Sequence, residues 1–175
     1  MRKLKNSELG RLSVEEFKNN DKSPIVVVMD NIRSSNNVGS LFRTSDALLV
    51  NALYLCGITN CPPSDDIRKT ALGAEESVDW KYFDNTLQAV QELREQGYKI
   101  CAIEQVEHSV MLPEFKPNKG EKLALVFGNE VKGVAQDVVD QCDVCIEIPQ
   151  FGTKHSLNIS VSAGIVLWDI FNKIS

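Results

Sequence analysis

Three polar loops hold most of the side chains in this chain that could do chemistry. The first runs from Asn31 to Arg43 and contains Arg33 and Asn37. Free amides at a helix N-terminus, together with two guanidinium groups, can seat a phosphate. We expect Arg43 to lie one turn into a helix that begins at about Gly39, with its guanidinium reaching back over Asn37. A capping asparagine followed by two solvated arginines is the alternative.

The second loop runs from Val126 to Gly133. Gly128 lets the backbone pass close to a ligand or to another chain segment, and Gly133 permits a sharp exit. The loop lacks the Gly-Lys-Ser ending of a triphosphate-binding loop, and the chain contains no Gly-x-Gly-x-x-Gly. These absences disfavour standard nucleotide-binding folds, and a plain strand-to-helix turn stays open.

The third loop begins at Ile148 and leads into a helix that we expect over Leu157–Lys173. Ser156 is well placed as the N-cap of this helix, and Asn158 would then lie in its first turn. The helix is apolar on nearly every side, which predicts burial in the core and against a second subunit. The small residues over 160–164 would allow close approach of another helix there.

The elements that must position these loops alternate along the chain. The run Ile25–Met29 is apolar without alternation, which is typical of a strand covered on both faces. We predict further strands over 52–56, 98–103, 123–127 and 144–148, and another helix over 85–96. This order predicts an α/β fold with a mainly parallel sheet flanked by helices. Because such sheets bind ligands at the carboxyl ends of their strands, we expect the three loops at one sheet edge.

The composition fits one compact domain over residues 24–175, preceded by a short helical extension over 1–23. The extension should form a helix over 7–20, with a capping box at Ser13 and an apolar side made by Leu9, Leu12 and Phe17. No segment approaches a membrane span, and five cysteines are an odd number for a disulfide framework. We therefore expect a cytoplasmic protein. The net charge of −5 disfavours general affinity for nucleic acid but leaves room for a local basic site.

The three loops together resemble the motifs of a known family. The segments are Asn37-x-Gly39-x3-Arg43, then Phe127-Gly128-Asn129-Glu130-x2-Gly133, then Ile148-Pro149-x6-Ser156-Leu157-Asn158-x-Ser160-x-Ser162. In this order they look like the motifs of the SpoU, or TrmH, family of RNA ribose methyltransferases in the SPOUT superfamily. The likeness extends from about Ile25 to Ile174.

The resemblance implies S-adenosyl-L-methionine as methyl donor, an RNA ribose 2′-hydroxyl as acceptor, a carboxyl-terminal trefoil knot and a homodimer. It implies no metal. It places the catalytic group at Asn37, Arg43, Glu130, Ser156 and Asn158. The cofactor-binding residues that it implies are Glu104, Phe127, Gly128, Asn129, Glu130, Ile148, Pro149, Phe151, Gly152, Ser156, Leu157 and Asn158, with Glu104 the weakest candidate.

In the family, the arginine that matches Arg43 is the proposed activating group. A guanidinium normally keeps its proton, so we interpret Arg43 as a clamp on the adjacent phosphate that polarises the hydroxyl, with deprotonation by Arg43 left open. RNA contacts are expected at Arg33, Asn37, Arg43, Arg68 and Lys69, although the last two could equally begin a solvated helix. The short extension mildly favours tRNA over rRNA.

Other interpretations stay open. A non-catalytic RNA-binding or nucleotide-binding module could keep the same fold, and an oxidoreductase is disfavoured by the missing phosphate loops. We interpret Cys142-x2-Cys145 as ordinary thiols, because a structural zinc site needs four ligands. Trp80, Tyr82 and Phe83 should pack in the core rather than stack on bases. We expect flexibility over 60–66 and 107–120.

Overall fold

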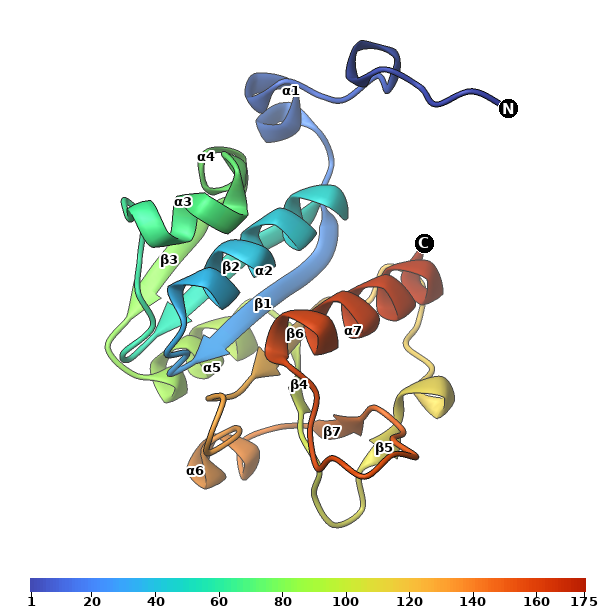
Figure 1. Ribbon diagram of the computed structural model, residues 1–175. Coiled ribbons are helices and arrows are strands. Elements are labelled where there is room, and N and C mark those ends of the chain that lie inside the picture. The colour runs from blue at the N-terminus through green and yellow to red at the C-terminus, as the bar shows by residue number, and fades with distance from the viewer.

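A computed structural model describes residues 1–175 as a single sheet with helices on both faces (Figure 1). The seven strands lie in the order β3-β2-β1-β6-β4-β7-β5, and every strand pair is parallel. The predicted α/β class with a mainly parallel sheet is therefore confirmed. The strands are β1 (Ser23–Asp30), β2 (Val50–Cys56), β3 (Trp80–Phe83), β4 (Lys99–Ile103), β5 (Val110–Met111), β6 (Leu123–Phe127) and β7 (Val144–Glu147).

The helices are η1 (Asn6–Glu8), α1 (Val14–Asn19), α2 (Ser35–Ala47), α3 (Asp65–Ala71), α4 (Ala74–Ser77), α5 (Thr86–Glu95), η2 (Leu112–Glu114), α6 (Gln136–Val139) and α7 (Ile159–Ile174). None of them combines the length and the apolar composition that crossing a membrane requires.

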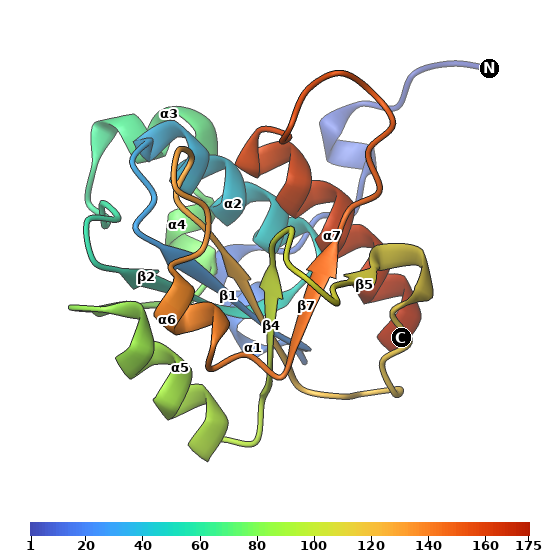
Figure 2. The same cartoon turned by 90° about the horizontal axis from the view of Figure 1, so that it is seen from below.

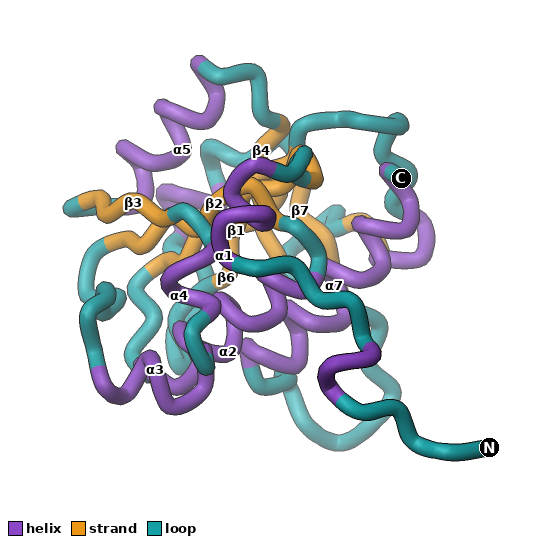
Figure 3. The backbone as a smooth tube through the Cα atoms, turned by 90° about the horizontal axis from the view of Figure 1, so that it is seen from above, coloured by secondary structure: helices purple, strands orange, loops and turns teal.

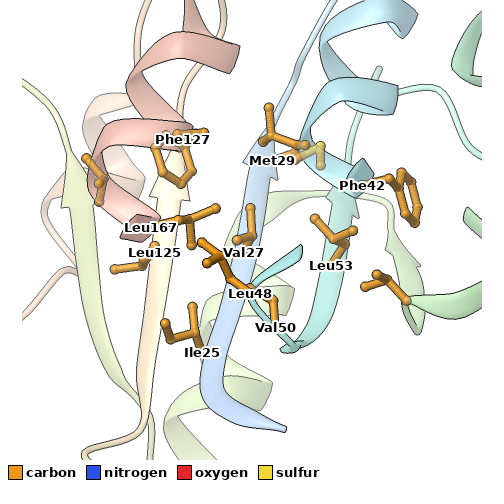
Figure 4. Packing of buried hydrophobic residues seen from close by; sticks show 14 of the residues in the cluster. Ile25, Val27, Met29, Phe42, Leu48, Val50, Leu53, Leu125, Phe127 and Leu167 are labelled. Carbon is orange, nitrogen blue, oxygen red and sulfur yellow. The ribbon is translucent and has the colours of Figure 1, made fainter. Parts of the chain in front are cut away.

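The core lies in two layers, one on each face of the sheet. Val27 of β1, Leu125 of β6 and Leu167 of α7 belong to the larger cluster, beneath α2 and α7 (Figure 4). Val28 of β1 and Leu93 of α5 belong to the smaller cluster on the opposite face. Successive side chains of a strand point to opposite faces, so the unbroken apolar run in β1 is buried on both.

The amino-terminal segment differs from the predicted helix over 7–20. It contains η1 and the six-residue helix α1, separated by Gly10 with a φ of 58°. Leu9 and Leu12 are exposed, and only Phe17 packs into the core. The predicted capping box is confirmed, since Ser13 and Glu16 bond reciprocally. Residues 1–12 run away from the rest of the chain (Figure 3).

The two helices next to the site begin at other residues than predicted. α2 begins at Ser35 rather than near Gly39, because Ser34 caps it by accepting a hydrogen bond from the Asn37 amide. α7 begins at Ile159, and its N-cap is Asn158, not Ser156. Asn158 therefore stands just outside the helix rather than in its first turn.

The segment around β3 also departs from expectation. β3 is a short edge strand, so Trp80 and Tyr82 remain partly exposed while Phe83 is buried. The prediction of core packing is thus right for Phe83 and wrong for the other two.

The stretch 107–120, expected to be flexible, contains β5 and η2 and buries Leu112 and Phe115.

Candidate active site

The three polar loops meet at the carboxyl edge of the sheet, as expected. A pocket of about 560 Å³ is lined by residues of the turn after β6, the ends of β4 and β7, and the start of α7. Figure 2 shows how β4, β7 and α7 are arranged. Its lining includes nine of the predicted cofactor residues, namely Glu104, Phe127, Gly128, Asn129, Glu130, Ile148, Ser156, Leu157 and Asn158.

The turn after β6 is a tight structure held by its own chain. Asn129 and Gly133 pair through two backbone hydrogen bonds of 3.0 and 2.8 Å. A Cβ on Gly128 would lie 2.1 Å from the Val134 nitrogen, and one on Gly133, which has a φ of 70°, would lie 2.3 Å from Glu104 Oε2. Of the two partners expected for Gly128, another chain segment is therefore the one that the structure shows. Larger side chains at either glycine would displace the turn.

Glu130 fastens this turn to the loop after β1. Its carboxylate accepts hydrogen bonds from the Arg33 nitrogen at 2.8 Å, the Ser34 nitrogen at 2.9 Å and Asn37 Nδ2 at 3.0 Å. Partial burial acts to raise the pKa of Glu130, but these hydrogen bonds outweigh it and hold the pKa below its ordinary value. Glu130 therefore holds the turn to the loop after β1 as an anion. A carboxylate with a lowered pKa is poorly suited to accept a proton from a substrate.

Glu104 supports the turn from the end of β4. Its Oε2 accepts a hydrogen bond from the Val134 nitrogen at 2.9 Å, and its Oε1 accepts one from the Gln105 nitrogen at 2.9 Å. Its carboxylate therefore shapes the pocket wall as well as lining it.

The start of α7 forms another wall. Asn158 Oδ1 accepts hydrogen bonds from the Ser160 nitrogen at 2.8 Å and from Ser160 Oγ at 2.6 Å. This capping fixes the first turn of the helix beside the pocket. Ser156 lines the pocket without capping the helix.

Three predicted cofactor residues lie elsewhere. Pro149, Phe151 and Gly152 are absent from the pocket lining. Phe151 is 97% exposed, and Pro149 lines a separate groove beside Trp168. Residues 151–154, between the lining residues Gln150 and His155, are exposed to solvent.

The basic residues that were predicted to contact RNA lie outside the pocket. Arg43 is exposed and has no hydrogen bond or ion pair within the chain. The side-chain amide of Asn37 donates to Glu130, so it does not hold the Arg43 side chain by a hydrogen bond. The side chain of Arg33 is also exposed and unpaired. Arg68 lies 3.1 Å from Glu76, and Lys69 lies 2.6 Å from Asp66. These two cations are therefore paired on the surface of α3, in its last turn rather than at a helix start.

Several residues that line the pocket were not predicted from the sequence. The polar and glycine members are Gln105, Lys132, Gly133, Glu147, Gln150, His155 and Ser162. Gly133 and Ser162 stood in the quoted motifs but were not predicted to bind the cofactor. Gln105 Nε2 donates a hydrogen bond of 2.8 Å to the His155 carbonyl, which ties the loop after β7 to the end of β4. Gln105 and Glu147 could have been found by their place at strand ends.

The charges around the pocket favour some ligands over others. Three carboxylates line it, from Glu104, Glu130 and Glu147, against the single ammonium of Lys132. A phosphate-rich ligand would be repelled there, while a cationic one would be attracted.

No group of three or more His, Cys, Asp and Glu side chains is placed to hold a metal ion. Burial raises the pKa of the Cys142 thiol to about 12 and also raises that of Cys145, so both stay protonated near neutral pH.

Fold and site together define a parallel α/β domain with a ligand pocket at the sheet edge where the three loops meet. The sequence profile of the SpoU rRNA methylase family matches residues 24–168, and the chain belongs to this family.

Individual relatives agree with this assignment. The chain is 32% identical over 151 residues to the 23S rRNA (guanosine-2′-O-)-methyltransferase RlmB of Neisseria meningitidis, a match that covers 86% of this chain and 59% of the relative. The chain thus spans about three fifths of the length of this curated relative. The A. aeolicus TrmH/SpoU tRNA modifying enzyme superposes with a TM-score of 0.80 and 27% identity, over 91% of this chain and 81% of that one. An AdoMet-bound rRNA methyltransferase from Sinorhizobium meliloti shares the fold, with a TM-score of 0.81 and 24% identity over 91% of this chain and 60% of the other.

Proposed function

We propose that this chain is an S-adenosyl-L-methionine-dependent RNA methyltransferase that acts on a ribose 2′-hydroxyl. The observation that carries the proposal is the pocket at the carboxyl edge of the sheet, joined by Glu130 to the loop that bears Asn37. Family membership and the names of the relatives support it. Residues 24–175 would form the catalytic domain, with 1–23 as an extension.

The pocket fits the methyl donor in size and charge. Its volume falls within the range of small-molecule sites, roughly 300–1,000 Å³. Its excess of carboxylates suits a sulfonium cation and opposes the phosphates of flavin or nicotinamide nucleotides. When bound, the donor supplies an electrophilic methyl group. The nine predicted residues that line the pocket would hold it; Pro149, Phe151 and Gly152 would not.

The acceptor side would be formed by the loop after β1. Because Arg43 has no partner within the chain, its guanidinium is free to clamp an RNA phosphate and to polarise the neighbouring hydroxyl. Asn37, held by Glu130, would orient the ribose, and Arg33 would add a second phosphate contact. Methyl transfer needs acceptor oxygen, methyl carbon and sulfur in line, so this positioning would supply much of the rate. Arg68 and Lys69 would contribute less, since their charges are already paired.

A homodimer completes the proposal. Leu157, Val161, Ile165 and Trp168 form an exposed apolar face along α7, beside the groove that contains Pro149. Exposed apolar surface of this kind is typical of subunit interfaces. Leu157 belongs both to this face and to the pocket, so a second subunit would lie close to the methyl donor. The trefoil knot, a cytoplasmic location and a mild preference for tRNA over rRNA remain part of the proposal.

Calorimetry with S-adenosyl-L-methionine, flavin and nicotinamide nucleotides tests the ligand class. We expect only the methyl donor to bind, with unchanged affinity and melting temperature after chelator treatment. Saturating titration without binding, or binding that the chelator abolishes, would contradict the proposal.

Transfer of labelled methyl groups to tRNA and rRNA then separates an enzyme from a binding module. Loss of one ribose methylation in a strain that lacks the protein would identify the target nucleotide. Binding of donor and RNA without any transfer would favour the non-catalytic alternative.

A further inference from the structure

Asn31, the first residue after β1, has a backbone conformation that side chains rarely adopt. Its φ is 55°, in the left-handed region. Asparagine tolerates this region better than most residues, but the conformation still has an energetic cost. Such conformations persist where surrounding contacts enforce them, and they concentrate at functional sites.

The contacts that enforce it come from the ends of the two strands that flank β1. At the end of β2, the Asn31 nitrogen donates to the Cys56 carbonyl at 3.3 Å, and Asn31 Oδ1 accepts from the Ile58 nitrogen at 3.1 Å. At the end of β6, Asn129 Nδ2 donates to the Asn31 carbonyl at 2.7 Å. One residue thus joins the ends of β1, β2 and β6.

The side chain of Asn31 is also fixed within its own strand end. Its Nδ2 donates to Asp30 Oδ1 at 2.9 Å. Asp30 is 1% exposed and is held by Thr86 Oγ1 at 2.6 Å and by the Ala135 nitrogen at 2.8 Å. A Cβ on Gly57 would lie 2.0 Å from Asn31 Oδ1, so only glycine at position 57 leaves room for the amide where it stands.

Asn31 lies a few residues before the side chains proposed to contact RNA. Only one residue separates it from Arg33, whose amide bonds Glu130, and Asn37 follows within α2. The left-handed turn at Asn31 therefore decides the direction in which the loop leaves β1. The partner of its carbonyl, Asn129, is adjacent to Glu130 and lines the pocket.

We propose that Asn31 is a positioning residue. Its left-handed turn directs the loop after β1, and with it Asn37 and Arg43 of α2, to the correct position beside the methyl-donor pocket. This inference rests on the proposed function. Asn31 does not line the pocket, so it would act on methyl transfer through the loop rather than by touching the donor.

A pair of substitutions separates the turn from the side chain. Asn31→Ala and Asn31→Gly both remove the amide, but only glycine adopts the left-handed conformation freely. We expect the single-turnover rate of Asn31→Ala to fall about 100-fold, as for other misplacements of about 1 Å. We expect Asn31→Gly to recover at least about tenfold of that loss by the same argument. Donor affinity should stay nearly unchanged in both.

A control and a second variant guard against a trivial loss of folding. Leu49, with a φ of 51°, precedes β2 at the far end of the sheet, so Leu49→Ala should lower stability without slowing transfer. Asn129→Asp removes the donor to the Asn31 carbonyl while keeping an acceptor for the amides of Val131 and Lys132. It should slow transfer, and combining it with Asn31→Ala should add little further loss.

Hydrogen exchange provides a readout independent of activity. In Asn31→Ala, the amides of Arg33 and Ser34 should exchange faster, while those of β6 stay protected. Equal transfer rates in Asn31→Ala and wild type, equal losses in the alanine and glycine variants, or a parallel loss of donor affinity would each overturn the inference. A wild-type protein that methylates no RNA, but shows the expected exchange pattern, would defeat the proposed function and leave the control of the loop by Asn31 standing.

Discussion

At the scale of single residues, Glu130 and Arg43 show how differently two charged side chains of one site are held. Glu130 accepts three hydrogen bonds from the loop after β1, which uses most of its capacity. Arg43 has no partner and its five donors are free for a ligand. The carboxylate therefore builds the site, while the guanidinium is available to the substrate.

Replacing Arg43 should separate substrate activation from donor binding. We expect Arg43→Ala to lower methyl transfer roughly 100-fold or more, as when one stabilising donor is removed from an active site. Donor affinity should remain nearly intact, because Arg43 does not line the pocket. Single-turnover assays and calorimetry measure the two quantities. Arg43→Lys is the control: it keeps the charge but loses bidentate geometry, so it should recover only part of the rate. Equal rates in Arg43→Ala and wild type would refute the role.

Replacing Glu130 should weaken the attachment of the loop after β1, and the loss of stability should depend on pH. A neutral glutamine amide has a single acceptor oxygen and cannot accept from all three donors. Glu130→Gln should therefore lower the free energy of unfolding by about 1 kcal/mol or less at this exposed site. The pKa of Glu130 is held below its ordinary value of 4.5. Its stabilisation is therefore present above about pH 4.5 and is lost as the pH falls through the lowered folded-state pKa.

Urea unfolding of wild type and Glu130→Gln at several pH values tests this. The difference between them should be constant near neutral pH and shrink in acid. A difference that stays the same down to about pH 3, or that grows in acid, would show that the carboxylate is not stabilised as an anion.

At the scale of elements, the first turn of α7 links helix capping to the pocket. Asn158 caps α7 and lines the pocket at once. We expect Asn158→Ala to lower the free energy of unfolding by about 1 kcal/mol, the usual effect of losing an N-cap. Donor affinity should fall with it, because Leu157 and Ser156 would lose their anchor.

Asn158→Asp is the matched variant for thermal unfolding and donor titration. Aspartate keeps an oxygen for the Ser160 amide and adds a favourable charge at the helix start, so stability should be retained. Full stability in Asn158→Ala would mean that the observed cap contributes nothing to the helix.

At the scale of the whole molecule, assembly and donor binding should be coupled through α7. Trp168 is 61% exposed and Ile165 is 40% exposed, so a charge at either position would not enter the core of its own subunit. Trp168→Glu and Ile165→Lys should therefore leave the fold intact but weaken the dimer, and donor affinity should fall with dimerisation. Leu87→Glu places a charge on an exposed apolar position of α5 and serves as control.

Light scattering and donor titration across a dilution series measure both properties. The control should remain dimeric and bind as wild type does. A stable monomer with undiminished donor affinity would rule out the coupling.

Local sequence patterns predicted much of this architecture. The unbroken apolar runs predicted the parallel sheet, and β6 spans the predicted residues 123–127. The order of strands and loops also predicted the meeting of the three loops at one edge, because carboxyl ends of parallel strands share that edge. The motif residues identified the family to which the chain belongs.

Contacts between distant segments decided the rest. Whether Ser156 or Asn158 caps α7 depends on where the helix packs, and both residues suit a cap equally by type. The bond between Asn37 and Glu130 joins residues 93 positions apart, and no local signal specifies it. The outward course of Phe151, the pairing of Arg68 and the left-handed turn at Asn31 likewise follow from tertiary packing, because each is set by neighbours that the linear sequence does not bring together.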